Sequence, residues 1–211
     1  MITFIKSKWK ELILYVVFLL LLILVLDNKA DLHVDEMWTY NLANAEQAFW
    51  PESGVEFVPA EKPYLDYHTS TGSFGMSNVW KQNSEDCHPP FYYALVHIIC
   101  SVFPGTFSVW YAGIINVVFQ LLILFILRKI IFLLTHDSVA GWIVSCSYIT
   151  CAGILSISSF LRMYVMLMFW ITFFSYVILK RLESFAGSDM LTVIIYKGSR
   201  MVICCNGLSL W

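Results

Sequence analysis

Long uninterrupted runs of apolar residues dominate the pattern along this chain. Four of them, at residues 11–26, 107–127, 139–161 and 163–179, approach or exceed the roughly 20 residues that an α-helix needs to cross a bilayer. A fifth run, residues 91–103, would span only about 20 Å as a helix and is expected to lie in the interface or to re-enter. The pattern therefore predicts an all-α integral membrane protein with about four transmembrane helices.

Three basic clusters flank the long runs, at residues 6–10, 128–129 and 180–181. Lysine and arginine gather on the cytoplasmic side of short loops, and all three clusters share one side only if the run at 91–103 does not cross. We therefore expect a multi-pass protein with a cytoplasmic N-terminus and one large outer loop over residues 27–106. A cleaved signal peptide is the alternative for the first run, but residues 27–29 lack the small-residue pattern that cleavage needs.

The outer loop contains two further helical signals besides a long stretch without a sustained period. An apolar stripe predicts a helix along the membrane surface from Asp35 until Trp50-Pro51 ends it; its members are Trp38, Leu42, Ala45 and Phe49. Residues 53–86 are expected to form a long loop or lid. Pro89 and Pro90 can then occupy the first turn of the short interfacial helix.

Composition agrees with the membrane assignment, since 59% of the 211 residues are hydrophobic and only 13% are charged. Eleven of the fifteen acidic residues lie between residues 27 and 90, which excludes nucleic acid as an expected partner because nucleic acid selects a basic face. Only Cys87 of the six cysteines lies clearly in the outer loop, and no disulfide framework follows.

Two adjacent carboxylates, Asp35 and Glu36, come shortly after the first apolar run and are the first candidates for chemistry. Asp35 also suits the N-cap of the helix that is expected to begin there. Adjacent helical side chains point about 100° apart, so the two carboxylates should not face one reacting centre. We expect one of them to act as a base while the other holds the helix in place.

Arg162 interrupts a nearly continuous apolar stretch, where an arginine costs roughly 3 kcal/mol unless it reaches water or an anion. Snorkelling to the surface is one interpretation, and a guanidinium that grips a phosphate through paired hydrogen bonds is the other. His88 is either an ordinary polar residue before Pro89-Pro90 or, with Asp35 or Glu36, a ligand of a divalent metal ion. No ligand-spacing signature accompanies it, so the metal requirement stays open.

Taken together, Asp35-Glu36, the segment His88-Pro89-Pro90-Phe91-Tyr92-Tyr93 and Arg162-Met163-Tyr164 resemble the GT-C superfamily of membrane glycosyltransferases. More narrowly, they are similar to bacterial family 39 and to dolichyl-phosphate-mannose protein mannosyltransferase-like proteins. The resemblance covers about residues 10–183 and rests on the order, spacing and membrane side of the motifs. It implies a GT-C-like N-terminal transmembrane module over residues 1–183 and a location in the bacterial plasma membrane.

The resemblance also implies a reaction and its partners. A sugar would move from a polyprenyl-phosphate donor to a hydroxyl of a lipid, glycan or protein on the outer face, with membrane lipid around the helices. Asp35 would be the base, with Glu36 as the neighbouring catalytic candidate. Arg162 would stabilise the leaving phosphate, with His88 and Tyr164 as further donors. No cofactor is implied with certainty, and a divalent metal ion remains an option.

Residues 184–211 depart from that family, whose members are much longer. A truncated or frame-shifted gene product is the simplest explanation of this atypical tail, and an inactive fragment is then one alternative. A non-catalytic membrane assembly subunit is another, because it would keep the helices without needing Asp35, His88 and Arg162. A transporter is disfavoured, since neither mid-membrane charges nor a repeated helix pattern occur.

Overall fold

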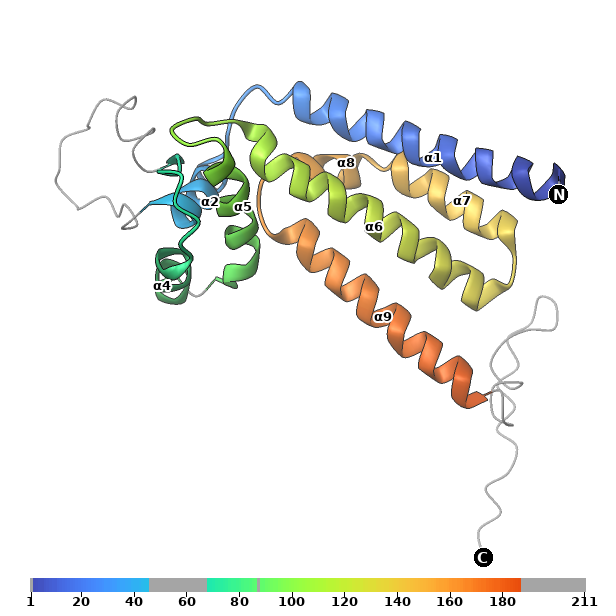
Figure 1. The fold of residues 1–211 in the computed structure, drawn as a ribbon. Coiled ribbons are helices and arrows are strands. Elements are labelled where there is room, and N and C mark those ends of the chain that lie inside the picture. Colours follow the sequence, from blue (N-terminus) through green and yellow to red (C-terminus); the bar gives the residue numbers. More distant parts are fainter. Residues whose placement is uncertain (1, 46–67, 87, 187–211) are drawn as a thin grey trace, which may run out of the picture.

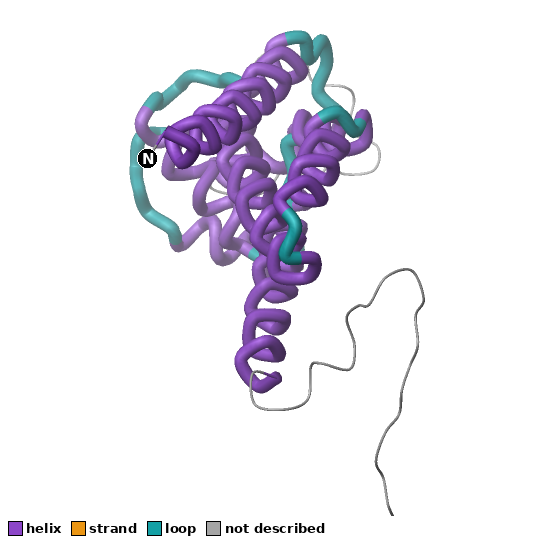
Figure 2. Tube along the Cα trace, turned by 90° about the vertical axis from the view of Figure 1, so that its right-hand side faces the viewer, coloured by secondary structure: helices purple, strands orange, loops and turns teal. Residues whose placement is uncertain are grey.

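The computed structural model describes residues 2–45, 68–86 and 88–186, and within these ranges the chain forms helices and no strand (Figures 1 and 2). The helices are α1 (Ile2–Asp27), α2 (Val34–Asn44), α4 (Ser77–Glu85), α5 (Pro90–Val102), α6 (Val109–Thr135), α7 (Ser138–Ile149), α8 (Ala152–Ser159) and α9 (Tyr164–Ala186). The predicted all-α class is therefore confirmed for the described part of the chain.

Three of the described helices are long and apolar enough to cross a membrane. The qualifying segments are Trp9–Asp27 in α1, Val109–Thr135 in α6 and Tyr164–Ser184 in α9. Their outer faces carry many large exposed apolar side chains, among them Leu20, Phe125 and Phe174, which water would not tolerate as contiguous patches. The structure is consistent with a multi-pass α-helical membrane protein.

The predicted span at residues 139–161 is not one straight helix. It is divided into α7 and α8, whose axes differ by 54° at a short break, so the pair counts as a fourth span only if the two are taken together. The Thr150 hydroxyl donates a hydrogen bond to the Cys146 carbonyl at 2.8 Å, a contact that competes with the helical ladder and bends helices. Apolarity alone did not reveal this interruption.

Two of the long helices continue past the charged residues that flank their apolar runs. The run at 107–127 continues as α6 through Arg128 and Lys129 to Thr135. Arg128 Nη2 lies 3.0 Å from the Glu11 carboxylate of α1, and the guanidinium stacks on the Trp142 ring at 4.8 Å. Partners on α1 and α7 therefore keep the charge of Arg128 inside the bundle. In the same way, α9 extends past residue 179 to Ala186.

Among the described residues of the outer-loop region there are three helices, where the sequence pattern predicted two. The surface helix predicted to reach Phe49 ends at Asn44, with Ala45 in an extended conformation, and Phe49 lies outside the described residues. The predicted loop at 53–86 contains α4, which the sequence pattern missed because its buried positions include Gln82 and Asn83. The atypical tail from residue 187 onward is likewise outside the described residues.

The helices form a bundle with a compact cap at one end (Figure 1). Helix α6 packs against α7 and α9, and α1 packs against α6 and α8. α1 and α6 approach closely at Gly113, where a Cβ atom would collide with the Leu26 side chain, as is usual where small residues bring membrane helices together. Helices α2, α4 and α5 form the cap.

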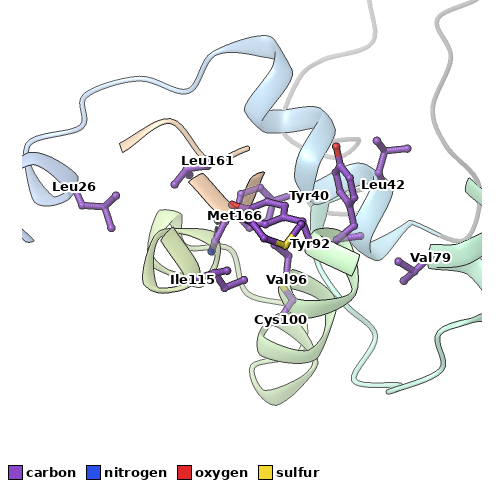
Figure 3. Close-up of a cluster of buried hydrophobic side chains, with 13 residues drawn as sticks. Leu26, Tyr40, Leu42, Val79, Tyr92, Val96, Cys100, Ile115, Leu161 and Met166 are labelled. Carbon is purple, nitrogen blue, oxygen red and sulfur yellow. Dashed lines mark hydrogen bonds between the residues drawn. The ribbon is translucent and has the colours of Figure 1, made fainter. Parts of the chain in front are cut away.

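α5 belongs to this cap and does not qualify as a membrane span, as its thirteen residues predicted. Its Tyr92 and Tyr93 are completely buried. They join a core to which α1, α2, α4, α5, α6 and α9 all contribute (Figure 3). The labelled members are Leu26, Tyr40, Leu42, Val79, Tyr92, Val96, Cys100, Ile115, Leu161 and Met166.

Candidate functional site

The start of α2 is organised by His33, which is the N-cap of this helix. Its Nδ1 accepts a hydrogen bond from the Asp35 backbone N–H at 3.2 Å, and its own backbone N–H donates to Glu36 Oε2 at 2.7 Å. Asp35 is therefore not the N-cap, and that prediction is wrong. The N-cap lies two residues earlier, since Glu36 at the third helical position can then reach back to it.

Glu36 is fully buried and has three partners. Besides the His33 backbone N–H, its carboxylate accepts from Leu161 N–H at 2.7 Å and pairs with Lys29 Nζ at 2.9 Å. These contacts tie the α1–α2 linker, the start of α2 and the α8–α9 connection together. Both carboxylate oxygens of Glu36 are already engaged, so of the two adjacent carboxylates Glu36 is the one that stabilises the fold.

The Asp35 carboxylate has a different environment, because about 45% of its side chain is exposed. The nearest ionisable group is His33, whose Nδ1 lies 3.5 Å from Asp35 Oδ2. That nitrogen already accepts the Asp35 backbone N–H, so it cannot also donate to the carboxylate. Asp35 is thus the more accessible of the two adjacent carboxylates and keeps its lone pairs available to a proton.

Arg162 occupies the short connection between α8 and α9 and is only 6% exposed. Its Nη1 donates to the Asp35 backbone carbonyl at 3.1 Å, and its Nη2 lies 3.2 Å from His88 Nε2. Nε is buried without a hydrogen-bond partner among the described residues. The guanidinium therefore contacts two neutral acceptors, and within the described part of the chain no carboxylate forms an ion pair with it.

His88 connects Arg162 to a carboxylate of α4's C-terminal end. Its Nδ1 lies 2.7 Å from Asp86 Oδ2, and its Nε2 faces Arg162 Nη2. A guanidinium nitrogen can only donate, so Nε2 must accept and the proton of a neutral ring sits on Nδ1. Asp86 therefore holds His88 in the tautomer whose Nε2 faces Arg162.

An apolar cavity of about 380 Å³ lies next to this cluster. It is lined by Pro89, Phe91, Met163, Met166, Leu167 and Trp170. Pro89 directly follows His88 and Met163 directly follows Arg162, so two of the lining residues are chain neighbours of the cluster. Tyr164, the first residue of α9, is partly exposed near the same connection and stacks on Phe160 with a centroid distance of 5.9 Å.

The two buried tyrosines of α5, Tyr92 and Tyr93, lie next to the cluster. The Tyr92 hydroxyl donates to Asn116 Oδ1 at 3.1 Å, and the Tyr93 hydroxyl contacts Met163 Sδ at 3.8 Å. Burial raises the pKa of Tyr93 to about 12, although the nearby Arg162 charge opposes the shift, and burial likewise raises the pKa of Tyr92 well above its usual value. Both phenols therefore stay neutral at physiological pH.

The structure brings three separate predicted motifs into one cluster, with Arg162 in contact with both Asp35 and His88. Glu36 lies in the same region, but its carboxylate is used for packing. Sequence reasoning missed Asp86 and Lys29. Asp86 was detectable as a carboxylate two residues before His88, whereas the Lys29–Glu36 pair depends on how the linker turns.

A metal site is not among the features that the structure assembles here. Within the described residues, no group of three His, Cys, Asp or Glu side chains is placed to hold a metal ion. His88 faces Asp86 and Arg162 instead of gathering with Asp35 and Glu36. Arg162 beside His88 would repel a cation, so no chemical step is assigned to a metal.

Comparisons of this chain with protein-family models, with curated proteins and with solved structures found no match.

Proposed function

We propose that this protein is a membrane glycosyltransferase, which moves a sugar from a polyprenyl-phosphate donor to a hydroxyl of a lipid, glycan or protein on the outer face of the membrane. The donor phosphate binds at Arg162, its apolar chain lies in the adjacent cavity, and Asp35 receives the proton of the acceptor. The resemblance to the GT-C superfamily supports a sugar as the transferred group, while the geometry of the site supports an anionic lipid as its carrier.

The observation that carries this proposal is a buried cation with no carboxylate partner. Buried charges are normally paired, because removing an ion from water is costly. Arg162 is 6% exposed, contacts only neutral acceptors among the described residues and keeps Nε without a partner. An incoming phosphate oxygen would supply the missing charge and accept the unused N–H groups.

The cavity supports a lipid as the group to which the anion is attached. Its six lining residues are apolar, and two of them directly follow His88 and Arg162 in the chain. A free sugar phosphate would gain nothing from such a surface, whereas a hydrocarbon chain gains about 25 cal/mol for each Å² removed from water. The combination selects a molecule with one charged end and one long apolar end.

The proposed step is a direct displacement at the anomeric carbon of the donor. The acceptor oxygen forms a bond to this carbon while its proton passes to the Asp35 carboxylate. The bond between the anomeric carbon and the phosphate oxygen breaks, and both of its electrons leave with the polyprenyl phosphate. Arg162 stabilises the added negative charge. Attack from the face opposite to the phosphate inverts the configuration at the sugar carbon.

A non-catalytic membrane subunit is the second candidate, and one observation favours it. Arg162 connects the α8–α9 segment to the Asp35 carbonyl of α2 and to His88, so its contacts would also serve a purely structural role. In that case the partly exposed Asp35 carboxylate has no chemical role, and its replacement leaves the activity of the protein unchanged.

The test is transfer of a radiolabelled sugar in membranes that contain the protein, with polyprenyl-phosphate sugars as donors and the endogenous lipids, glycans and proteins as acceptors. Asp35→Asn is compared with wild type and with Asp31→Asn, a matched control at another exposed carboxylate of the same linker region. Arg162→Lys serves as a third variant, because it keeps the charge but loses the planar fork.

We expect wild type and Asp31→Asn to transfer sugar equally, and Asp35→Asn to lose roughly 100-fold or more, the usual contribution of a general base. Arg162→Lys should retain the fold but transfer poorly. Equal transfer by Asp35→Asn and wild type would remove Asp35 from the mechanism. Absence of transfer from every donor, in a protein that is folded and inserted, would favour the non-catalytic subunit.

A further inference from the structure

A second groove lies at the end of the bundle opposite to the cap, between α1 and α7 (Figure 1). Its volume is about 510 Å³, and it is lined by Lys10, Ile13, Leu14, Val17, Trp142, Cys146 and Ile149. The α1 residues follow a spacing of three and four, as do those of α7, so each helix contributes one face. At 1.5 Å per residue, the groove is about 10 Å long.

Basic side chains lie at one end of this groove. This end contains Lys10 of α1 and Trp142 of α7. The Arg128 guanidinium stacks on the Trp142 ring at 4.8 Å while its Nη2 pairs with Glu11. Its Nη1 is buried with no hydrogen-bond partner among the described residues. Lys10 is exposed, and within the described part of the chain no carboxylate pairs with it.

The charge at this end is therefore positive. Among the described side chains of this region, the three cations Lys10, Arg128 and Lys129 outnumber the two carboxylates Glu11 and Asp137. Glu11 is already paired with Arg128, and Asp137 accepts the Val139 N–H as the N-cap of α7. What remains is the exposed Lys10 ammonium at the groove and, behind Trp142, an Arg128 guanidinium whose Nη1 is buried without a partner among the described residues.

We propose that this groove binds an anionic phospholipid, with the phosphate at Lys10, where the neighbouring Arg128 adds positive charge, and one acyl chain between α1 and α7. Basic pockets between membrane helices recognise such headgroups, and the apolar walls match a hydrocarbon chain. A second transmembrane helix fits less well, because the groove is only about two turns long and ends in charge. The proposed lipid is distinct from the sugar donor, and the inference does not depend on the glycosyltransferase proposal.

The test uses the full chain, reconstituted into vesicles that mix phosphatidylcholine with phosphatidylglycerol and then extracted gently for native mass spectrometry. The ratio of retained phosphatidylglycerol to retained phosphatidylcholine is the readout. Lys10→Gln is the main variant, because Lys10 is exposed and its replacement should not disturb folding. Lys129→Gln is the matched control: it removes the same charge at the same end, but Lys129 lies over the outward-facing Phe125 ring. Cys146→Trp fills the groove.

We expect wild type and Lys129→Gln to retain phosphatidylglycerol in preference to phosphatidylcholine. Lys10→Gln should lower this preference roughly fivefold, as the loss of one basic residue near a membrane surface predicts, and Cys146→Trp should abolish retention. Equal retention of both lipids by wild type, or equal effects of Lys10→Gln and Lys129→Gln, would overturn the proposal. The proposal would also be overturned if wild type formed dimers without bound lipid and Cys146→Trp dissociated these dimers, since a second copy would then occupy the groove.

Discussion

Replacement of Glu36 by Gln should destabilise the protein strongly, although it changes only one oxygen to an NH₂ group. Glu36 is fully buried and accepts from the Leu161 and His33 backbone N–H groups while pairing with Lys29. A glutamine has one acceptor oxygen, so one backbone N–H would face a donor. Lys29, whose side chain is only 13% exposed, would lose its counter-charge.

The expected loss is about 3 kcal/mol, the lower end of what breaking a buried ion pair costs. For a chain of this length that corresponds to a fall of roughly 6–12 °C in the denaturation midpoint. Asp35→Asn should change the free energy of unfolding by less than about 1 kcal/mol, because the Asp35 side chain is partly exposed and contributes mainly through the helix dipole. The neighbouring carboxylates thus separate into a structural and a chemical one.

The assay is thermal denaturation of the purified variants in one detergent at one scan rate, since membrane proteins rarely unfold reversibly. Lys29→Met should be less damaging when combined with Glu36→Gln than the sum of the two single effects predicts, because both remove the same pair. Equal midpoints for Glu36→Gln and wild type would refute the structural role of Glu36. A larger loss in Asp35→Asn than in Glu36→Gln would reverse the assignment.

Three further predictions concern the surroundings of the site. In wild type, ¹⁵N chemical shifts should show the His88 proton on Nδ1, and Asp86→Asn should populate the other tautomer; an unchanged tautomer in the variant would remove Asp86 from this role. Asn116→Ala should cost about 1–3 kcal/mol, seen as a lower denaturation midpoint, because the Asn116 amide donates to the Ser158 and Phe160 carbonyls. The midpoint should also fall between pH 10 and 12, since the folded chain keeps a Tyr93 proton until about pH 12 while the unfolded chain loses it near pH 10; Tyr93→Phe should make this fall shallower, and an unchanged slope would contradict it.

The helices that the sequence predicts well are those whose evidence is local. Length and apolarity identified the three long candidate spans and showed that α5 was too short to be one. The order of the motifs also predicted that Asp35, His88 and Arg162 would meet. Asn116 and Gln120, four residues apart on α6, form hydrogen bonds with Tyr92 of α5 and Tyr148 of α7.

Features that depend on distant partners could not be predicted in this way. Helix α4 has no apolar stripe, because the Gln82 and Asn83 side chains donate to the Ala45 and Leu42 carbonyls of the α2 region. The continuation of α6 through Arg128 requires Glu11, which lies on another helix. A local pattern contains no information about either partner.

The division of labour between Asp35 and Glu36 was only half predictable. Their adjacency indicated that one would face the site and the other would not. Which one did so was decided by the linker, because Lys29 and the Leu161 N–H approach Glu36 from two sides. The N-cap likewise moved from Asp35 to His33 when Glu36 was fixed at the third position of α2.

Equilibrium binding of a radiolabelled polyprenyl-phosphate sugar to the purified protein tests the central claim most directly, with the uncharged polyprenol as competitor control. Wild type and Asp35→Asn should bind the donor equally tightly, Arg162→Lys should bind it about tenfold more weakly because a bidentate contact is lost, and polyprenol should compete poorly. Equal competition by polyprenol and polyprenyl phosphate, or unchanged donor binding in Arg162→Lys, would contradict the assignment of Arg162 as the phosphate-binding residue.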